Sequence, residues 1–193
     1  MRERLYRFLR IIVRAFVIPI CLPKVSGREH IPASGPVMVC SNHVSDFDPI
    51  IQGCVFRRSV RFMGKQELFG IKWFAAIIKS LGAFPVSRGG NDISAVRKSL
   101  EILKNDEVLV IFPQGHRYKH DDNRAIETGA ALIALRSKAA VVPVHMTRFR
   151  LFRRMRISIG APVALNDLMG KYDAESLKEA TARIADGIWS GVS

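Results

Sequence analysis

Short apolar runs alternate with amphipathic segments along most of the chain. The runs have the length of buried strands, and the segments between them carry apolar residues at the three- and four-residue spacing of helices. The predicted strands are 37–40, 60–63, 82–88, 108–112, 139–144 and 155–159. The predicted helices are 49–57, 67–80, 92–105, 128–138 and 173–189, the third capped by Asn91 or Asp92 and the last by Asp173. The alternation predicts a single α/β domain, with a largely parallel mixed sheet flanked by helices.

The first 24 residues carry a pattern of their own. Five apolar side chains fall on one helical stripe and five arginines lie between them: Leu5, Phe8, Leu9, Ile12 and Phe16, and Arg2, Arg4, Arg7, Arg10 and Arg14. The uninterrupted apolar stretch Ala15–Leu22 is far below the about 20 residues that span a bilayer, and no small-residue cleavage site follows it. We therefore expect neither a transmembrane anchor nor a signal peptide. We expect residues 1–24 to form a basic amphipathic helix at a membrane interface, with 25–193 as the main domain, although a stripe that packs on the domain is the alternative.

Three other segments are informative. Residues 25–36 contain Gly, Ser and Pro and are expected to form a turn-rich lead-in to the first central strand. The segment 67–80 is too apolar for an ordinary surface helix, so it either faces an apolar ligand or membrane or belongs to the core. Residues 148–154 alternate arginine with Phe and Leu, which suits contact with anionic lipid or cofactor phosphates, contact with nucleic acid, or a solvated face.

Charge narrows the class of partner. The chain of 193 residues has 30 Lys and Arg against 17 Asp and Glu, a formal net charge of +13, so anionic partners are expected. A hydrophobic share of 48% is high for so basic a chain and favours an anionic membrane surface over nucleic acid. The cysteines Cys21, Cys40 and Cys54 show no paired or metal-like spacing and are expected to be buried and reduced, as in a protein on the cytoplasmic side.

Polar residues follow four of the apolar runs. His43, Arg88, Arg117 and His145 each come just after a predicted strand. In a largely parallel sheet the carboxyl ends of the strands meet at one edge, where ligands of open α/β sheets bind. The pattern therefore predicts one site that gathers these four residues.

The residues after the first of these strands are the strongest candidates for catalysis. His43 is followed by Asp46 and Asp48, and a histidine at a strand end can act as a base whose tautomer a nearby carboxylate fixes. On residue type alone Asp46 and Asp48 are equivalent candidates. Ser45 raises the alternative of a hydrolase nucleophile, which we consider weak because residues two apart in a loop rarely meet in attack geometry and no nucleophile elbow surrounds it. No residue cluster calls for a metal.

Four blocks in this order resemble the glycerolipid acyltransferase family, specifically the 1-acyl-sn-glycerol-3-phosphate acyltransferases, over about residues 35–165. The first block is a His and an Asp separated by four residues, met by His43 and Asp48 after Asn42. The second runs from Gly82 to Arg88, and the fourth is Val142-Pro143-Val144. The third is Phe-Pro-Glu-Gly-Thr-Arg in the family and reads Phe112-Pro113-Gln114-Gly115-His116-Arg117 here, so Gln114 and His116 depart from it.

The resemblance implies a reaction. An acyl group would move from an acyl-CoA or acyl-carrier-protein thioester, used as co-substrate with no other cofactor, to the free hydroxyl of 1-acylglycerol-3-phosphate, giving phosphatidic acid. His43 would be the general base and Asp48 its partner, which the family spacing prefers over Asp46. Arg88 and Arg117, with Lys65 as a weaker candidate, would hold the acceptor phosphate.

Supporting roles would fall to the neighbouring residues of the blocks: Asn42, Ser45, Gly82, Gln114, Gly115 and His116. The departures at Gln114 and His116 bear on acceptor identity, so another lysolipid acceptor is the first alternative. A non-catalytic basic protein of the membrane surface is the second. In the main interpretation the protein is peripheral or monotopic on the cytoplasmic face of the membrane, with a lysophospholipid, a thioester donor and anionic lipid as partners and no nucleic acid.

Overall fold

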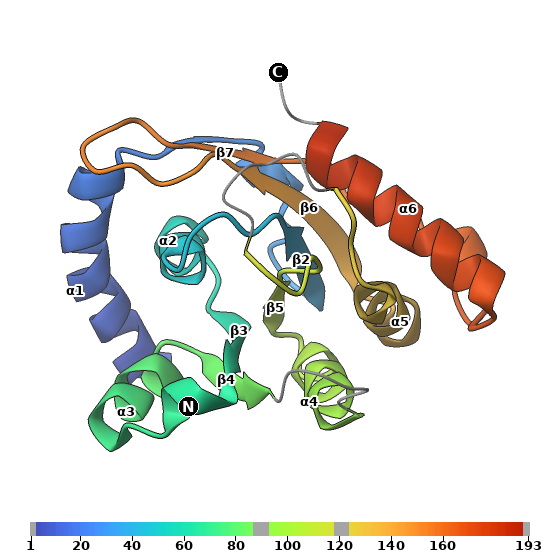
Figure 1. Cartoon of the computed structure of the whole chain (residues 1–193), viewed down its shortest axis with the longest axis horizontal. Helices are drawn as coiled ribbons and strands as arrows, with labels where there is room; N and C mark the ends of the chain where they lie inside the picture. Colours follow the sequence, from blue (N-terminus) through green and yellow to red (C-terminus); the bar gives the residue numbers. More distant parts are fainter. Residues whose placement is uncertain (1–2, 87–92, 118–123, 191–193) are drawn as a thin grey trace.

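The computed structural model describes residues 3–86, 93–117 and 124–190 (Figure 1). Strands and helices alternate as the apolar pattern predicts. In chain order the elements are α1 (Glu3–Cys21), β1 (Lys24–Ser26), the 3-10 turn η1 (Arg28–His30), β2 (Val37–Ser41), α2 (Asp48–Val55), β3 (Val60–Lys65), the 3-10 turn η2 (Gln66–Phe69), α3 (Lys72–Ser80), β4 (Ala83–Val86), α4 (Ile93–Lys104), β5 (Val108–Ile111), α5 (Thr128–Ser137), β6 (Ala140–Met146), β7 (Arg156–Ile159), the 3-10 turn η3 (Asn166–Leu168) and α6 (Ala174–Ser190).

The strands join in one sheet in the order β1-β7-β6-β2-β5-β3-β4. Every neighbouring pair is parallel except β6 and β7, which are antiparallel. Strand β2 lies at the centre, and all five of its residues are buried between β5 and β6. The predicted single α/β domain with a largely parallel mixed sheet is thus confirmed. The parallel arrangement brings the loops that follow β2, β5 and β3 to one edge of the sheet.

Helices cover both faces of the sheet (Figure 1). On one face Met38 and Leu109 belong to an apolar core with α4, α5 and α6, and on the other Val37, Val39 and Val108 belong to a core with α2 and the C-terminal part of α1. Alternate residues of one strand thus serve opposite cores, as the two-residue period of a strand requires. The site at the sheet edge therefore rests on a strand that is fixed from both sides.

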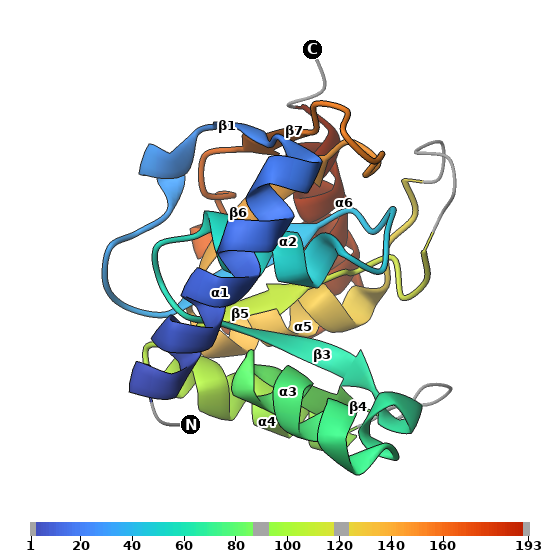
Figure 2. The same ribbon diagram turned by 90° about the vertical axis from the view of Figure 1, so that its left-hand side faces the viewer.

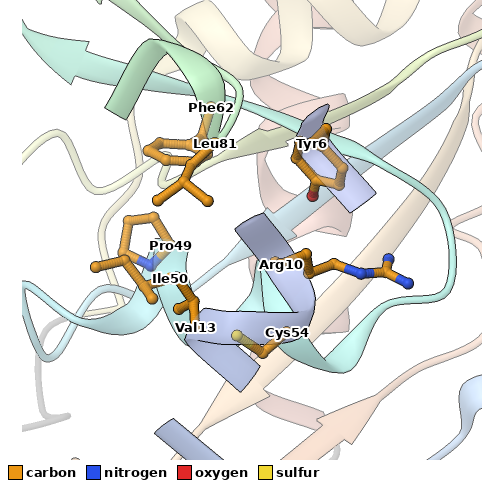
Figure 3. A pocket seen from close by; sticks show the side chains of 9 residues that line it. Tyr6, Arg10, Val13, Pro49, Ile50, Cys54, Phe62 and Leu81 are labelled. Carbon is orange, nitrogen blue, oxygen red and sulfur yellow. The ribbon is translucent and has the colours of Figure 1, made fainter. Parts of the chain in front are cut away.

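Helix α1 uses two different faces. On its inner face the Tyr6 hydroxyl accepts a hydrogen bond from the Val60 N–H at 3.1 Å, and Arg10 Nη1 donates to the carbonyls of Phe56 and Arg57, both at 3.0 Å. Figure 3 shows Tyr6 and Arg10 beside a small pocket that also borders Pro49 and Ile50 of α2. The outer face exposes large apolar side chains that recur at helical spacing: Phe8, Ile11, Ile12 and Phe16. The sequence leaves open whether this helix packs on the domain or exposes an apolar stripe. In the structure it does both, on opposite faces.

Several elements depart from the predicted boundaries. The lead-in 25–36 was expected to be turn-rich, but it begins within β1, a three-residue edge strand parallel to β7 that contains too few apolar residues to be visible in the pattern. The segment 67–80 is not one helix, since η2 ends at Phe69 and α3 begins only at Lys72, and α3 exposes Trp73 and Ile77. A pure core helix is therefore excluded there. The predicted caps Asn91 and Asp92 lie outside the described residues.

Two smaller predictions are confirmed. Asp173 caps α6, because its Oδ1 accepts the Ser176 N–H at 2.9 Å, and these hydrogen bonds from Ser176 lower the pKa of Asp173. Cys21, Cys40 and Cys54 are free and buried, and burial raises the pKa of Cys40 to about 12 and that of Cys54 to about 11. Within the described ranges, no helix has both the length and the apolar character needed to cross a membrane.

Gly82 offers a test of the sheet. Its φ of +98° is unfavourable for any side chain, and an added Cβ would collide with the backbone carbonyl of Val60 in β3. Gly170 also has a positive φ, +81°, but nothing lies within 4 Å of the place its Cβ would take. We expect Gly170→Ala to lower the free energy of unfolding by about 1 kcal/mol and Gly82→Ala by about 3 kcal/mol. Urea unfolding followed by circular dichroism measures both, and equal losses would contradict the close approach at Gly82.

Candidate active site

The site begins where β2 ends. Asn42 is buried, and its side-chain amide bonds both backbone groups of Met146 in β6, since Nδ2 donates to the carbonyl at 2.9 Å and Oδ1 accepts the N–H at 2.8 Å. These two side-chain hydrogen bonds replace the backbone hydrogen bonds that would otherwise continue the pairing of β2 with β6. The backbone of residue 43 is then free to leave the sheet and turn toward α2.

His43 and Asp48 form the centre of the site. Nδ1 of His43 lies 2.9 Å from Oδ2 of Asp48, the imidazole is 12% exposed, and the carboxyl group is fully buried. The same Oδ2 accepts the backbone N–H groups of Val44 at 2.8 Å and of Ser45 at 2.7 Å. An oxygen that receives two backbone donors acts as the acceptor toward the ring as well, so Nδ1 carries the proton and Nε2 is the basic nitrogen of neutral His43.

The backbone places the carboxylate for this role. Asp48 is the first residue of α2 and is followed by Pro49, a residue suited to the first turn of a helix. Its negative charge lies at the positive end of the helix macrodipole. Asp46 is instead exposed and forms an ion pair with Arg117. Between the two carboxylates that residue type could not separate, the geometry therefore selects Asp48 as the partner of His43.

The loop that follows β5 supplies the third side of the site. The His43 N–H donates to Oε1 of Gln114 at 2.8 Å, and Gln114 is buried. The Phe112 ring stacks on the imidazole, with centroids 4.2 Å apart and an interplanar angle of 25°. The sequence predicts Gln114 as a supporting residue but does not reveal Phe112 as a contact of the ring. In the sequence, Phe112 is marked only by its position, two residues before Gln114 and at the end of a predicted strand.

Cationic side chains lie farther out. Arg117 Nη1 pairs with Asp46 Oδ2, and both side chains are substantially exposed, at 41% and 74%. The ion pair brings Arg117 to the loop that carries His43. Lys65 is the last residue of β3 and is half-buried, two strands away from β2. Arg88 lies outside the described residues.

Other predicted residues have local roles or lie away from His43. The Ser45 hydroxyl accepts the Phe47 N–H at 3.2 Å within the turn. Gly115 adopts a φ of +69° in the turn after Gln114, and His116 is exposed beside it. Gly82 precedes β4 and therefore lies at the strand end opposite to the site.

The prediction that His145 follows its strand is wrong. His145 is buried inside β6, because the strand continues to Met146, whose backbone groups are bound by the Asn42 side chain. The predicted strand end at residue 144 is therefore two residues early, but β6 runs parallel to β2 with Val144 opposite Ser41, so His145 lies level with Asn42 near the predicted edge of the sheet.

The arrangement is suited to general-base chemistry. A basic Nε2, a proton held on Nδ1 and a buried carboxylate that can stabilise the imidazolium are the parts that accept a proton from a weakly acidic hydroxyl and later return it. Among the described residues, no group of three His, Cys, Asp or Glu side chains is placed to hold a metal ion.

Similarity to known proteins extends over most of the chain. The sequence pattern of the family described as Acyltransferase matches residues 23–147. The chain is 30% identical over 165 residues to a 1-acyl-sn-glycerol-3-phosphate acyltransferase of Bacillus subtilis, with 82% of each chain covered. It is 32% identical over 183 residues to a protein of the same name from Streptococcus pneumoniae, covering 87% of this chain and 67% of that one.

A solved structure shares the fold. The crystal structure of the 1-acyl-sn-glycerophosphate acyltransferase PlsC from Thermotoga maritima superposes with a TM-score of 0.68 at 22% identity, covering 98% of this chain and 83% of that one.

The hydrogen bonds at His43 predict its tautomer. In neutral His43 the proton should reside on Nδ1, because Oδ2 of Asp48 is an acceptor for three N–H groups. Long-range ¹H–¹⁵N correlation spectra of histidine-labelled protein measure this directly, with His43→Gln to assign the signal and the exposed His116 as an internal reference. A neutral ring protonated on Nε2 would contradict the assignment of the basic nitrogen.

Proposed function

Since this chain belongs to the acyltransferase family, we propose that it is a 1-acylglycerol-3-phosphate O-acyltransferase that forms phosphatidic acid from a thioester donor. The observation that carries the proposal is the hydrogen bond from Nδ1 of His43 to the buried Asp48, which leaves Nε2 as a base. Two relatives with the name 1-acyl-sn-glycerol-3-phosphate acyltransferase support the acceptor, and the proposed donor is acyl-CoA or acyl-carrier protein.

The proposed reaction is a direct transfer. The acceptor hydroxyl gives its proton to Nε2 of His43 as its oxygen attacks the thioester carbonyl carbon, and the carbonyl electrons move to oxygen. When the carbonyl re-forms, the carbon–sulfur bond breaks and the sulfur takes the proton from the imidazolium. The products are an ester and a free thiol, and His43 is neutral again. Asp48 stabilises the imidazolium while it exists.

Ser45 is a poor nucleophile in this arrangement. Its hydroxyl oxygen accepts the Phe47 N–H, and its own N–H serves Asp48, so both groups hold the turn. A hydrolase that forms an acyl-serine is therefore disfavoured. Membership in an enzyme family likewise speaks against a non-catalytic membrane-surface protein.

The acceptor phosphate is assigned to arginine. A guanidinium presents its N–H groups in a fork that matches phosphate oxygens, and it stays charged at all working pH values. Arg117 is joined to Asp46 by an exposed ion pair, and such pairs contribute only about 0–1 kcal/mol. A phosphate dianion can therefore displace the Asp46 carboxylate at small cost. Arg88 and Lys65 remain proposed as further phosphate contacts.

The departures in the third block are compatible with this function. Gln114 supplies an acceptor oxygen to the His43 N–H, and an amide oxygen does this as a carboxylate does. His116 is exposed next to Arg117, so it has room to contact the acceptor headgroup. Another lysolipid headgroup is therefore the second candidate for the acceptor, and a direct comparison of lysolipids separates the two.

We further propose that α1 (Glu3–Cys21), within residues 1–24, is a membrane-interface helix attached to an acyltransferase domain of residues 25–193. The exposed Phe8, Ile11, Ile12 and Phe16 lie opposite the face of α1 that packs on the domain. Helix α3, which contacts α1, adds exposed Trp73 and Ile77. Apolar area of this extent beside a charge of +13 suits peripheral or monotopic attachment to an anionic cytoplasmic membrane face.

Removal of the base tests the mechanism. We expect His43→Ala to lower kcat by about 10²- to 10⁴-fold. Asp48→Asn keeps an oxygen for the Val44 and Ser45 N–H groups but loses the charge, so it should lower kcat without unfolding the loop. Radiolabelled acyl transfer to lysophosphatidic acid, with melting temperatures as the control for folding, measures both. Undiminished transfer by folded His43→Ala would refute general-base catalysis by this residue.

Arg117 tests acceptor recognition. We expect Arg117→Ala to raise KM for lysophosphatidic acid at least tenfold and to change kcat less, because the lost contact is to the non-reacting phosphate. Asp46→Asn should leave KM unchanged or lower it, since it removes the competing carboxylate. An uncharged monoacylglycerol is the reference acceptor, and an equal effect of Arg117→Ala on both acceptors would contradict a phosphate contact.

A further inference from the structure

The β6–β7 loop, residues 147–155, presents a surface that the proposed chemistry does not use. Leu151 is 62% exposed and Phe152 is 70% exposed. Arg150, Arg153 and Arg154 are exposed around them. Large apolar side chains beside cations match the interface of an anionic bilayer, where the apolar groups enter the acyl boundary and the guanidinium groups meet phosphates.

Hydrogen bonds hold this loop in its conformation. The Phe152 N–H donates to the Ile20 carbonyl at 3.1 Å, and the Met155 N–H donates to the Cys21 carbonyl at 3.2 Å. Both acceptors belong to the last turn of α1. Phe152 adopts a φ of +54°, a conformation that bulky residues rarely take. The apolar tip is thus fixed in an outward position against the helix.

The loop continues the exposed face of α1. In Figure 1 both lie on the same side of the molecule, and in Figure 2, where that side faces the viewer, the loop lies beyond the C-terminal end of the helix. The exposed Leu22 directly follows α1 in the chain. It is therefore next to Ile20 and Cys21, whose carbonyls accept hydrogen bonds from the loop. Phe16 lies about one helical turn before Ile20, whose carbonyl accepts the Phe152 N–H, and both phenylalanines are exposed, so one flat partner can contact them together.

The same loop reaches the His43 site. The Phe149 ring contacts the Phe47 ring edge-on, with centroids 5.4 Å apart and an interplanar angle of 61°. Phe47 directly precedes Asp48 in the chain. The loop thus connects the outer face of α1 with the turn that carries the proposed base and its carboxylate.

We propose that residues 150–154 are a second membrane contact, which docks on an anionic bilayer and brings the lipid headgroup layer to the rim of the His43 site. The occupant is a lipid surface because the loop combines three arginines with two exposed apolar side chains. Coenzyme phosphates alone would use the charges and leave Leu151 and Phe152 without a partner.

The experiment measures binding of the full chain to vesicles. Leu151→Asp with Phe152→Asp removes the apolar tip, and aspartate tolerates the positive φ at 152 better than phenylalanine does. The matched control is Ile93→Asp on α4, a site that is 70% exposed on the opposite face of the sheet. A charge variant replaces Arg150, Arg153 and Arg154 with Gln, and its control replaces Arg97, Lys98 and Lys104 of α4 with Gln.

Sedimentation with phosphatidylglycerol–phosphatidylcholine vesicles should show at least tenfold weaker binding for the tip variant and none of this loss for Ile93→Asp. The charge variant should lose roughly fivefold per arginine on anionic vesicles and little on pure phosphatidylcholine, while its control changes far less. Melting temperatures should stay constant, and kcat for a detergent-dispersed lysolipid should stay within twofold of the unchanged chain.

Two results would overturn the proposal. One is vesicle binding that survives the tip substitution. The other is a charge variant that binds vesicles normally but has a raised KM for acyl-CoA, which would assign the loop to coenzyme phosphates. Vesicle binding requires no turnover, so failure of the proposed function would be seen separately, as a chain that binds vesicles and acylates no lysolipid.

Discussion

One oxygen atom organises the candidate site. Oδ2 of Asp48 accepts three N–H groups, from the His43 ring and from the backbones of Val44 and Ser45. These bonds close the turn between β2 and α2 around the carboxylate, so the spacing of four residues between His and Asp follows from the geometry of the turn. The turn must end at the first residue of α2, where the helix favours a negative charge. A longer or shorter loop would separate the carboxylate from either the ring or the helix.

The sheet then fixes the turn from both sides. Asn42 reaches to β6 through its bonds to Met146, and Gln114 reaches from the end of β5 to the backbone of His43. Because β5 and β6 are the two parallel neighbours of β2, each contact crosses one strand spacing. This explains why residues far apart in the chain form one constellation. It also explains why a glutamine can stand in the third block, since the contact with His43 needs an acceptor oxygen and no charge.

The sequence predicts much of this arrangement for identifiable reasons. Buried strands such as Val37–Ser41 are long apolar runs, so the sheet and its helices were visible in the pattern. Residue type could not separate Asp46 from Asp48, because only the start of α2 decides which carboxylate turns inward. The stacking of Phe112 on His43 depends on strand order, which a single sequence does not contain. The three-residue strand β1 is held by backbone pairing and carries almost no side-chain signal.

The two faces of α1 show where sequence patterns are ambiguous and how structure resolves them. An apolar stripe on a helix indicates that the stripe is covered but does not say what covers it. In α1 the inner face is marked instead by Tyr6 and Arg10, whose polar ends bind backbone groups of the domain. A purely apolar stripe can then remain outside, on a helix that is already anchored. Burial of apolar area contributes roughly 25 cal/mol per Å², so the apolar side chains exposed on α1, α3 and the β6–β7 loop favour binding to a partner that covers them. For the proposed lysolipid acyltransferase, the bilayer is a partner that would also supply the substrate.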